Sequence, residues 1–401
     1  MNILQRALVT GCICAPSLLY ARGISLFEQD AVATARGNAF VATADNPSAI
    51  FYNPAGITQL SGQQVRVGAY ALTYQTSYHP PTGAEVNSER AFEAIPQLYY
   101  TCSLSNWPVS FGLGVYSPFG LSMKWPENTG FRSVALEGSV QYFTVQPVIA
   151  WQAHPTLSLG IGPTLNYART DLKQGLSPFA GNDSFRFKGD AFAPGFTAGI
   201  HWQPVEQHAF GIVYRSATTM DSHGNTKTFS TTPTVSLREG AEVEFEFPQS
   251  VTCGWSYRPT PQWNLEFDAN WTDWASFGSM PIQQATPVPP LTLNWRSSWY
   301  FAWGATRKFG NGWRASAGYI FSENTVPDRH FTPLVPDTDR HAWSVGVGRD
   351  CGRWSWDVAY QLTWGTPRTV TGSSPSLAGQ SADGRYEWWN HALAVSTGYR
   401  F

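Results

Sequence analysis

The sequence WNLEFDANW, residues 263–271, decides the fold, because it alternates residue by residue between two kinds of side chain. Trp263, Leu265, Phe267, Ala269 and Trp271 are apolar, and the residues between them are Asn, Glu, Asp and Asn. Successive side chains of a β-strand point to opposite faces, so this segment predicts a strand with one apolar and one polar face.

The same alternation recurs through the chain in segments of roughly 10 residues or more, whereas strands of globular proteins have about 5–6 and membrane-spanning strands about 9–11. The polar faces hold mostly small or neutral residues, which suits the inside of a wide barrel, and Trp side chains fall near strand ends. The sequence therefore predicts an all-β, 14-stranded antiparallel transmembrane β-barrel with strands near 63–76, 94–105, 108–118, 135–153, 157–171, 191–203, 208–220, 245–258, 262–275, 292–308, 313–321, 341–349, 353–364 and 386–401.

The composition supports this interpretation. Of 401 residues, 13% are charged and 15% are aromatic, against about 25% charged in average soluble proteins. A net charge of -2 argues against nucleic-acid binding, and the apolar content excludes disorder. After the first 20 residues, no apolar run of about 18 residues predicts a membrane helix.

The connections alternate between short turns and long polar links, which is typical of outer-membrane barrels. We expect the long loops at about 173–190, 221–243, 276–291, 322–340 and 366–385.

The N-terminus predicts export. Arg6 and the apolar run after it resemble a secretory signal peptide, which we assign to residues 1–21. Three cysteines remain after cleavage at distant, irregular positions, and neither a disulfide framework nor a metal site is predicted.

Residues 22–60 do not alternate and read as short helical pieces. Asn46-Pro47 and Asn53-Pro54 each place a capping residue before proline, the usual order at a helix start. A barrel of fourteen strands is wider than its own side chains fill. We therefore expect residues 22–60 to be a plug, or hatch, inside the barrel of residues 61–401.

An ordered set of motifs resembles the FadL/TodX family of outer-membrane transporters for long-chain fatty acids and other hydrophobic compounds. The resemblance covers essentially the whole mature chain and rests on Gly23-Ile24, Ala44 to Gly56, Ser117-Pro118-Phe119-Gly120-Leu121 with Trp125 and Arg132, Tyr214-Arg215-Ser216, Trp271 to Trp274, Val326 to Asp328, Pro336 to Arg340 and Gly398 to Phe401.

This resemblance implies passive uptake in four parts. Extracellular loops capture the ligand, an internal apolar pocket holds it, the hatch gates it, and a kinked third strand lets it leave through the barrel wall. It assigns hatch positioning and gating to Ile24, Asn53, Pro54 and Ala55, and the lateral gap to Ser117, Pro118, Phe119 and Gly120. Family members often carry an aromatic residue where this chain has Ile24. Gly112 and Gly114 are further candidates for weakening the third strand.

For three other residues, the sequence leaves two possible roles open. Arg132 either binds a ligand carboxylate or pairs with a loop carboxylate. Phe179 and Phe229 are expected in outer loops, where they contribute to ligand capture or contact lipopolysaccharide.

Other assignments complete the interpretation. No cofactor, metal site or catalytic motif is predicted, so the protein is not expected to be an enzyme. Expected partners are fatty acids or other hydrophobic small molecules, outer-membrane lipid and lipopolysaccharide, and the barrel assembly machinery through the terminal Phe401, with a monomer as the expected state. The expected location is the outer membrane of a Gram-negative-type bacterium. Alternatives are a channel for aromatic or alkane hydrocarbons, a polar-solute porin, an outer-membrane enzyme, and a soluble Trp-rich sandwich.

Overall fold

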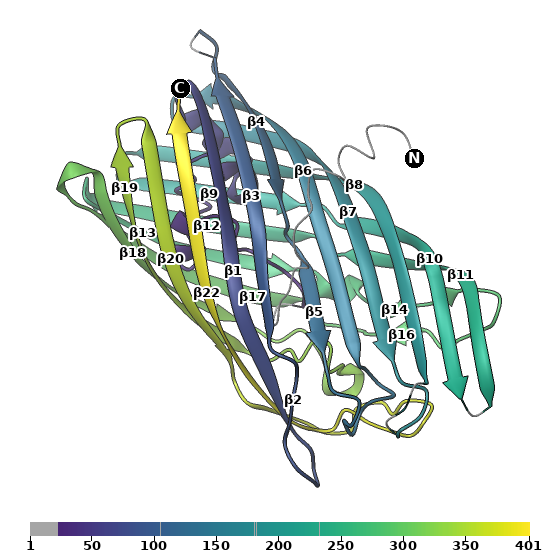
Figure 1. Cartoon of the computed structure of the whole chain (residues 1–401). Helices are drawn as coiled ribbons and strands as arrows, with labels where there is room; N and C mark the ends of the chain where they lie inside the picture. Colours follow the sequence, from purple (N-terminus) through teal and green to yellow (C-terminus); the bar gives the residue numbers. More distant parts are fainter. Residues whose placement is uncertain (1–22, 105, 180, 182, 232) are drawn as a thin grey trace.

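The computed structural model describes residues 23–104, 106–179, 181, 183–231 and 233–401, so the predicted signal peptide lies outside the described residues. Fourteen antiparallel strands form a closed barrel (Figure 1). In chain order they are β1 (Gln63–His79), β3 (Ala91–Ser103), β4 with β5 (Val109–Tyr116, Gly120–Lys124), β6 (Glu137–His154), β7 (Leu157–Gln174), β8 (Ser184–Val205), β9 with β10 (His208–Arg215, Thr218–Thr231), β11 with β12 (Thr234–Phe247, Ser250–Thr260), β13 (Trp263–Thr272), β17 (Ser298–Lys308), β18 (Trp313–Ser322), β19 (Arg340–Cys351), β20 (Trp354–Gly365) and β22 (Gly384–Arg400).

The barrel closes between the first and last strands. β1 pairs with β22 from Gln64 opposite Arg400 to His79 opposite Arg385. The predicted fold class is confirmed, and so is the position of each of the fourteen strands, apart from shifted ends and interruptions.

The burial pattern is the reverse of that in a soluble protein. Outward apolar side chains such as Ile161 and Val345 remain half exposed, while polar side chains such as Asn166, Asp268 and Gln361 are buried inside. Exposed tryptophans lie near both ends of the strands, including Trp263, Trp354, Trp299 and Trp389. An apolar belt bordered by aromatic rings is the surface that a lipid bilayer requires.

Short turns join the strands at the end of the barrel that holds the C-terminus, and longer connections lie at the other end (Figure 1). The longer connections contain the 3₁₀ turns η2 (Trp274–Ser276) and η4 (Asp328–His330) and the short strands β2 (Val86–Asn87), β14 (Ser279–Met280), β15 (Ile282–Gln283), β16 (Leu291–Thr292) and β21 (Arg368–Val370), whereas η3 (Gly310–Gly312) forms a short turn.

Two of the predicted long loops are wrong in extent. β8 already begins at Ser184, and β10 and β11 stay paired from Thr218 opposite Phe247 to Thr231 opposite Thr234. In β10 the extension over residues 221–231 is almost wholly polar, and in β11 the charged Glu239 interrupts the apolar face. The alternation that marks a membrane-spanning strand is therefore incomplete in this hairpin.

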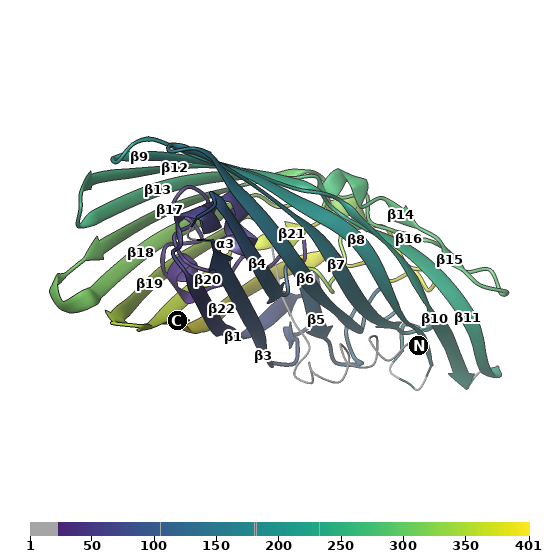
Figure 2. The same cartoon turned by 90° about the horizontal axis from the view of Figure 1, so that it is seen from above.

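The hatch lies inside the barrel, as Figure 2 shows. It contains α2 (Ala31–Ala35), α3 (Ala49–Tyr52) and the 3₁₀ helix η1 (Pro54–Gln59), and β1 follows at Gln63. Asp30 caps α2 by accepting a hydrogen bond from the Val32 amide. Asn53 caps η1 by accepting one from the Ala55 amide, with Pro54 at the first helical position.

Candidate functional site

The beginning of the hatch is hydrogen-bonded to the point where the third wall strand is interrupted. Ser25 and Phe119 form an isolated antiparallel bridge. The Leu26 amide donates to the Pro118 carbonyl at 2.7 Å, and the Gly120 amide donates to the Ile24 carbonyl at 2.9 Å. The hatch therefore supplies backbone partners to wall residues that lack them within the sheet.

The interruption leaves part of the wall without a hydrogen-bonded ladder. β3 pairs with β4 only from Leu98 to Ser103, and β5 pairs with β6 on one side only. Residues 117–119 stand opposite only two residues of β6, 142 and 143, so one extra residue bulges from the strand. The wall between residues 91–97 and β5 has no β-ladder. Gly112 and Gly114, by contrast, stay paired within β4.

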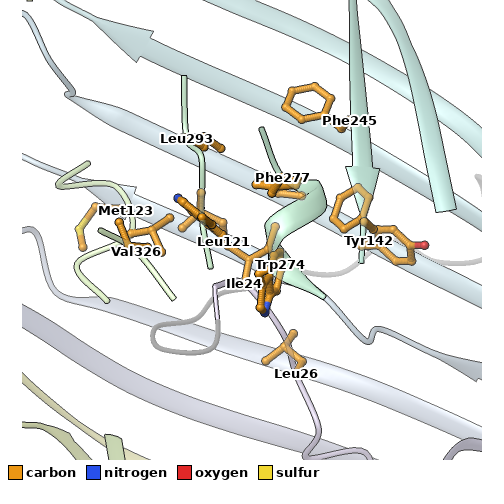
Figure 3. Close-up of a cluster of buried hydrophobic side chains, with 14 of the residues drawn as sticks. Ile24, Leu26, Leu121, Met123, Tyr142, Phe245, Trp274, Phe277, Leu293 and Val326 are labelled. Carbon is orange, nitrogen blue, oxygen red and sulfur yellow. The ribbon is translucent and has the colours of Figure 1, made fainter. Parts of the chain in front are cut away.

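An apolar cluster lies where the hatch begins and extends toward the long connections (Figure 3). Ile24 and Leu26 from the hatch lie near Trp274, and Leu121 and Met123 come from β5. Phe119 joins this cluster through ring contacts with Tyr142, Phe247 and Trp274. The lumen beside the interrupted strand is therefore apolar and largely aromatic.

A cavity of about 60 Å³ lies between Phe51 of α3 and the Phe119 and Tyr142 side of this cluster. One side is aromatic and the other carries hydroxyl and amide groups; the wall includes Phe27, Phe51, Tyr116, Phe119, Tyr142, Thr144, Thr164, Asn166, Arg215, Ser216, Thr218 and Ser250. A cavity that binds benzene measures about 150 Å³. In this conformation the cavity is therefore less than half the size of that benzene site.

The Asn53-Pro54-Ala55 segment fixes the hatch against the barrel wall. The Asn53 side chain donates to the carbonyl oxygens of Val41 in the hatch and Ile200 in β8. A Cβ placed on Gly160 would lie 2.4 Å from the Ala55 backbone nitrogen, and one on Gly199 would lie 2.3 Å from the Asn53 Oδ1. The wall needs glycine at both positions because the hatch approaches so closely.

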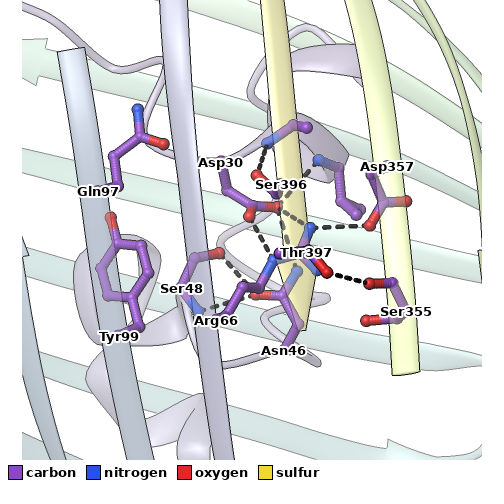
Figure 4. A network of polar contacts seen from close by, with 12 residues as sticks. Asp30, Asn46, Ser48, Arg66, Gln97, Tyr99, Ser355, Asp357, Ser396 and Thr397 are labelled. Carbon is purple, nitrogen blue, oxygen red and sulfur yellow. Dashed lines mark hydrogen bonds and ion pairs between the residues drawn. The ribbon is translucent and has the colours of Figure 1, made fainter. Parts of the chain in front are cut away.

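Two sets of buried charges hold the hatch from other sides. Arg66 of β1 bridges Asp30 of the hatch and Asp357 of β20, at 2.5 and 2.9 Å (Figure 4). On β13, Glu266 pairs with Arg36 at 3.0 Å and accepts the Ala42 amide, while Asp268 accepts the amides of residues 40 and 41.

The roles of these charges were not predicted from the sequence. Glu266 and Asp268 lie on the polar face of the strand that first indicated the fold. Two acids two residues apart on an inward face were an available signal, but the sequence alone does not show which groups they meet.

The Arg132 side chain is bound by groups of the outer loops. Its Nε donates to Glu127, its Nη1 faces Asp183 and the Ser177 carbonyl, and its Nη2 donates to the carbonyls of Gly181 and Asp183. Loop groups therefore occupy all five donors of this fully buried guanidinium. The geometry matches the loop-pairing alternative, and Arg132 has no donor left for a ligand carboxylate.

Arg132 also acts on the acidity of its partner. Burial pushes the pKa of Asp183 up, but the hydrogen bond from Ser177 and the charge of Arg132 outweigh burial, so the net pKa is lowered. Asp183 is thus held as a carboxylate in the closed loop.

The two predicted capture residues lie in different settings. Phe179 is 77% exposed in the connection between β7 and β8. Phe229 lies in β10, opposite Ser236 and Ser184, so its predicted placement in a loop is wrong.

Within the described part of the chain, no group of three or more His, Cys, Asp or Glu residues is arranged to hold a metal ion. No helix in that part is both long and apolar enough to cross a membrane.

A closed barrel with a lipid-facing exterior, a plugged lumen and an interrupted wall defines a class of outer-membrane transport proteins. Residues 12–401 match the family model described as "Outer membrane protein transport protein (OMPP1/FadL/TodX)". The chain belongs to this family.

Among its relatives, the long-chain fatty acid transport protein of Escherichia coli K12 is 21% identical over 356 residues, covering 76% of this chain and 79% of the relative. The chain also resembles two solved structures. A Pseudomonas aeruginosa FadL homologue has a TM-score of 0.86 at 19% identity, covering 94% of this chain and all of the other. The Pseudomonas putida toluene transporter TodX has a TM-score of 0.73 at 17% identity, covering 97% of this chain and all of the other.

The protein is therefore a multi-pass β-barrel of the Gram-negative outer membrane that transports hydrophobic compounds. Members of its family are transport channels and not enzymes.

Proposed function

We propose that the protein takes up long-chain fatty acids passively, by loop capture, transfer to the internal apolar cluster, movement of the hatch and lateral exit through the wall. Membership of the family and the relatives named as fatty acid transport proteins support this substrate class. The apolar cluster offers a path lined by side chains that suit a hydrocarbon tail.

The observation that carries the mechanism is the pairing of Ser25 with Phe119 beside the unpaired stretch of β3. The same short segment of hatch borders the cavity and occupies the interruption of the wall. Any displacement of that segment would enlarge the cavity and free the gap together, so a single movement would serve both gating and exit.

A single deletion tests lateral exit. The third strand has one residue too many opposite β6, so deleting Pro118 gives its two halves a common register and lets the strand continue beside β3. We expect this deletion to abolish delivery of labelled oleate into the bilayer of proteoliposomes. The control, Pro118→Ala, keeps the extra residue and should keep most of the transport.

Parallel assays with toluene and maltose test the alternative substrates. A hydrocarbon channel would pass toluene but not oleate, and a polar porin would pass maltose. Undiminished oleate delivery by the deletion variant would show that the ligand does not leave through the wall.

A further inference from the structure

Arg215 is a partly buried cation that the uptake path described so far does not use. It ends β9, where the seventh wall strand is interrupted, and it lines the cavity. Its Nη2 donates to the Phe51 carbonyl, and its guanidinium carbon lies 4.5 Å from the centre of the Phe51 ring. Its Nε is buried and has no hydrogen-bond partner among the described residues.

No described carboxylate forms an ion pair with Arg215. The titratable groups that act on it are the hydroxyls of Tyr116, Tyr52, Tyr300 and Tyr99. The buried Arg36, Arg66 and Arg132 are different, because each has at least one carboxylate within 3.1 Å. A guanidinium whose Nε is shielded from water and meets no acid is costly, so Arg215 calls for a counter-charge.

The contact with the hatch uses only part of the hydrogen-bonding capacity of the Arg215 guanidinium. The Phe51 carbonyl lies near the C-terminal end of α3, where a cation is favourable. That contact uses one Nη donor and leaves the Nε–H, which forms one edge of the guanidinium fork, without a partner.

The surroundings of Arg215 fit an amphiphile. Ser216, Thr218 and Ser250 supply hydroxyls around it. On the other side, Phe119 and Tyr142 both line the cavity and pack against Phe247 in the apolar cluster. A charged head group at Arg215 would thus have an apolar path for its tail within one continuous lining.

We propose that Arg215 binds the anionic head group of the transported ligand, a carboxylate, while the hydrocarbon tail lies along Phe119, Tyr142 and Phe247. This inference rests on the proposed uptake function and assigns recognition of the ligand's head group to one residue. A carboxylate matches the planar fork of arginine and supplies the acceptor that Nε lacks. A neutral hydrocarbon supplies none.

The test compares two ligands that differ only at the head group. Binding of oleate and oleyl alcohol to the purified full-length protein in a maltoside detergent is measured at pH 8 by equilibrium dialysis. We expect the wild type to bind oleate about 10- to 100-fold more tightly than the alcohol.

The variants separate charge from structure. Arg215→Gln keeps a donor for the Phe51 carbonyl and should lose the preference for oleate while binding the alcohol within about twofold of the wild type. Arg215→Lys keeps the charge without the fork and should be intermediate. Arg307→Gln is the matched control, because Arg307 also stacks on aromatic rings, those of Trp263 and Phe309, but does not line the cavity.

Two results would overturn the inference while leaving the uptake function intact: equal weakening of both ligands in Arg215→Gln, or equal affinities for both in the wild type. Failure of the wild type to bind either ligand would refute the proposed function, and this inference with it.

Discussion

Ser25 of the hatch and Phe119 of the third wall strand are partners in an antiparallel bridge, although 94 residues separate them in the sequence. The bridge lets the plug act as a short piece of sheet at the place where the barrel has no continuous ladder. Any movement of this part of the hatch must therefore break or carry along the bridge to the wall.

Removing one donor from this link should raise the resting permeability. Leu26→Pro eliminates the amide that donates to the Pro118 carbonyl, at a cost of about 1–3 kcal/mol. Leu26→Ala removes the same side chain but keeps the amide. In planar bilayers we expect the proline variant to open more often than the alanine variant. Equal opening of the two would show that this hydrogen bond does not contribute to gating.

Adding a methyl group to the wall should displace the hatch. In Gly160→Ala the new carbon would lie 2.4 Å from the Ala55 nitrogen, and overpacking of this kind costs about 1–3 kcal/mol. Single-channel recordings should show a higher baseline conductance. Gly240→Ala, where no heavy atom lies within 4 Å, is the control and should record as wild type.

Glu266→Gln should loosen the hatch without opening the barrel. It leaves Arg36 as a buried charge without this partner, and breaking a buried ion pair costs about 3–5 kcal/mol. Hydrogen exchange should accelerate at the amides of residues 40–43, while those of β1 and β22 stay protected. Glu242→Gln, at an exposed position in β11, should change neither region. Unchanged exchange at residues 40–43 would mean that Glu266 does not anchor the hatch.

Acid should release the loop that Arg132 closes. The pKa of Asp183 is lower in the folded protein than in the unfolded chain, so its ionisation stabilises the fold above its unfolded pKa of about 4. That stability is lost as the pH falls through the lower, folded pKa. Proteolysis near Phe179 by an acid-active protease should therefore increase only below about pH 4. Asp183→Asn should be cleaved near Phe179 at neutral pH by chymotrypsin, which is active there, whereas the wild type should resist it. Equal resistance of the variant and the wild type would contradict the argument.

The sequence predicted the barrel because a bilayer imposes a strict period on every strand that crosses it. The alternation in residues 263–271 reports lipid on one face and the lumen on the other, and the same rule located all fourteen strands. Where β10 and β11 leave the membrane, the rule no longer applies. Phe229 was for that reason placed in a loop when it belongs to a hairpin.

The internal contacts of the site were harder to predict than the barrel. Local signals located the cap formed by Asn53 and the proline of the third strand, because both depend on neighbours in sequence. Arg132 and Arg215 were both visible in motifs, but their roles depend on distant partners. In the structure, Arg132 pairs with loop residues such as Asp183, whereas Arg215 lines the cavity.

The small size of the cavity bears on how the surrounding membrane remains sealed. A space of about 60 Å³ is less than half of a cavity that binds benzene, so this conformation offers little room there for the compounds that the family carries. Flux then depends on the fraction of time spent in a wider conformation, and each 1.4 kcal/mol of opening free energy lowers that fraction about tenfold. A cargo that binds the wider conformation more tightly raises that fraction itself. We therefore expect the barrel to open mainly while cargo is bound and to remain part of the membrane's permeability barrier at other times.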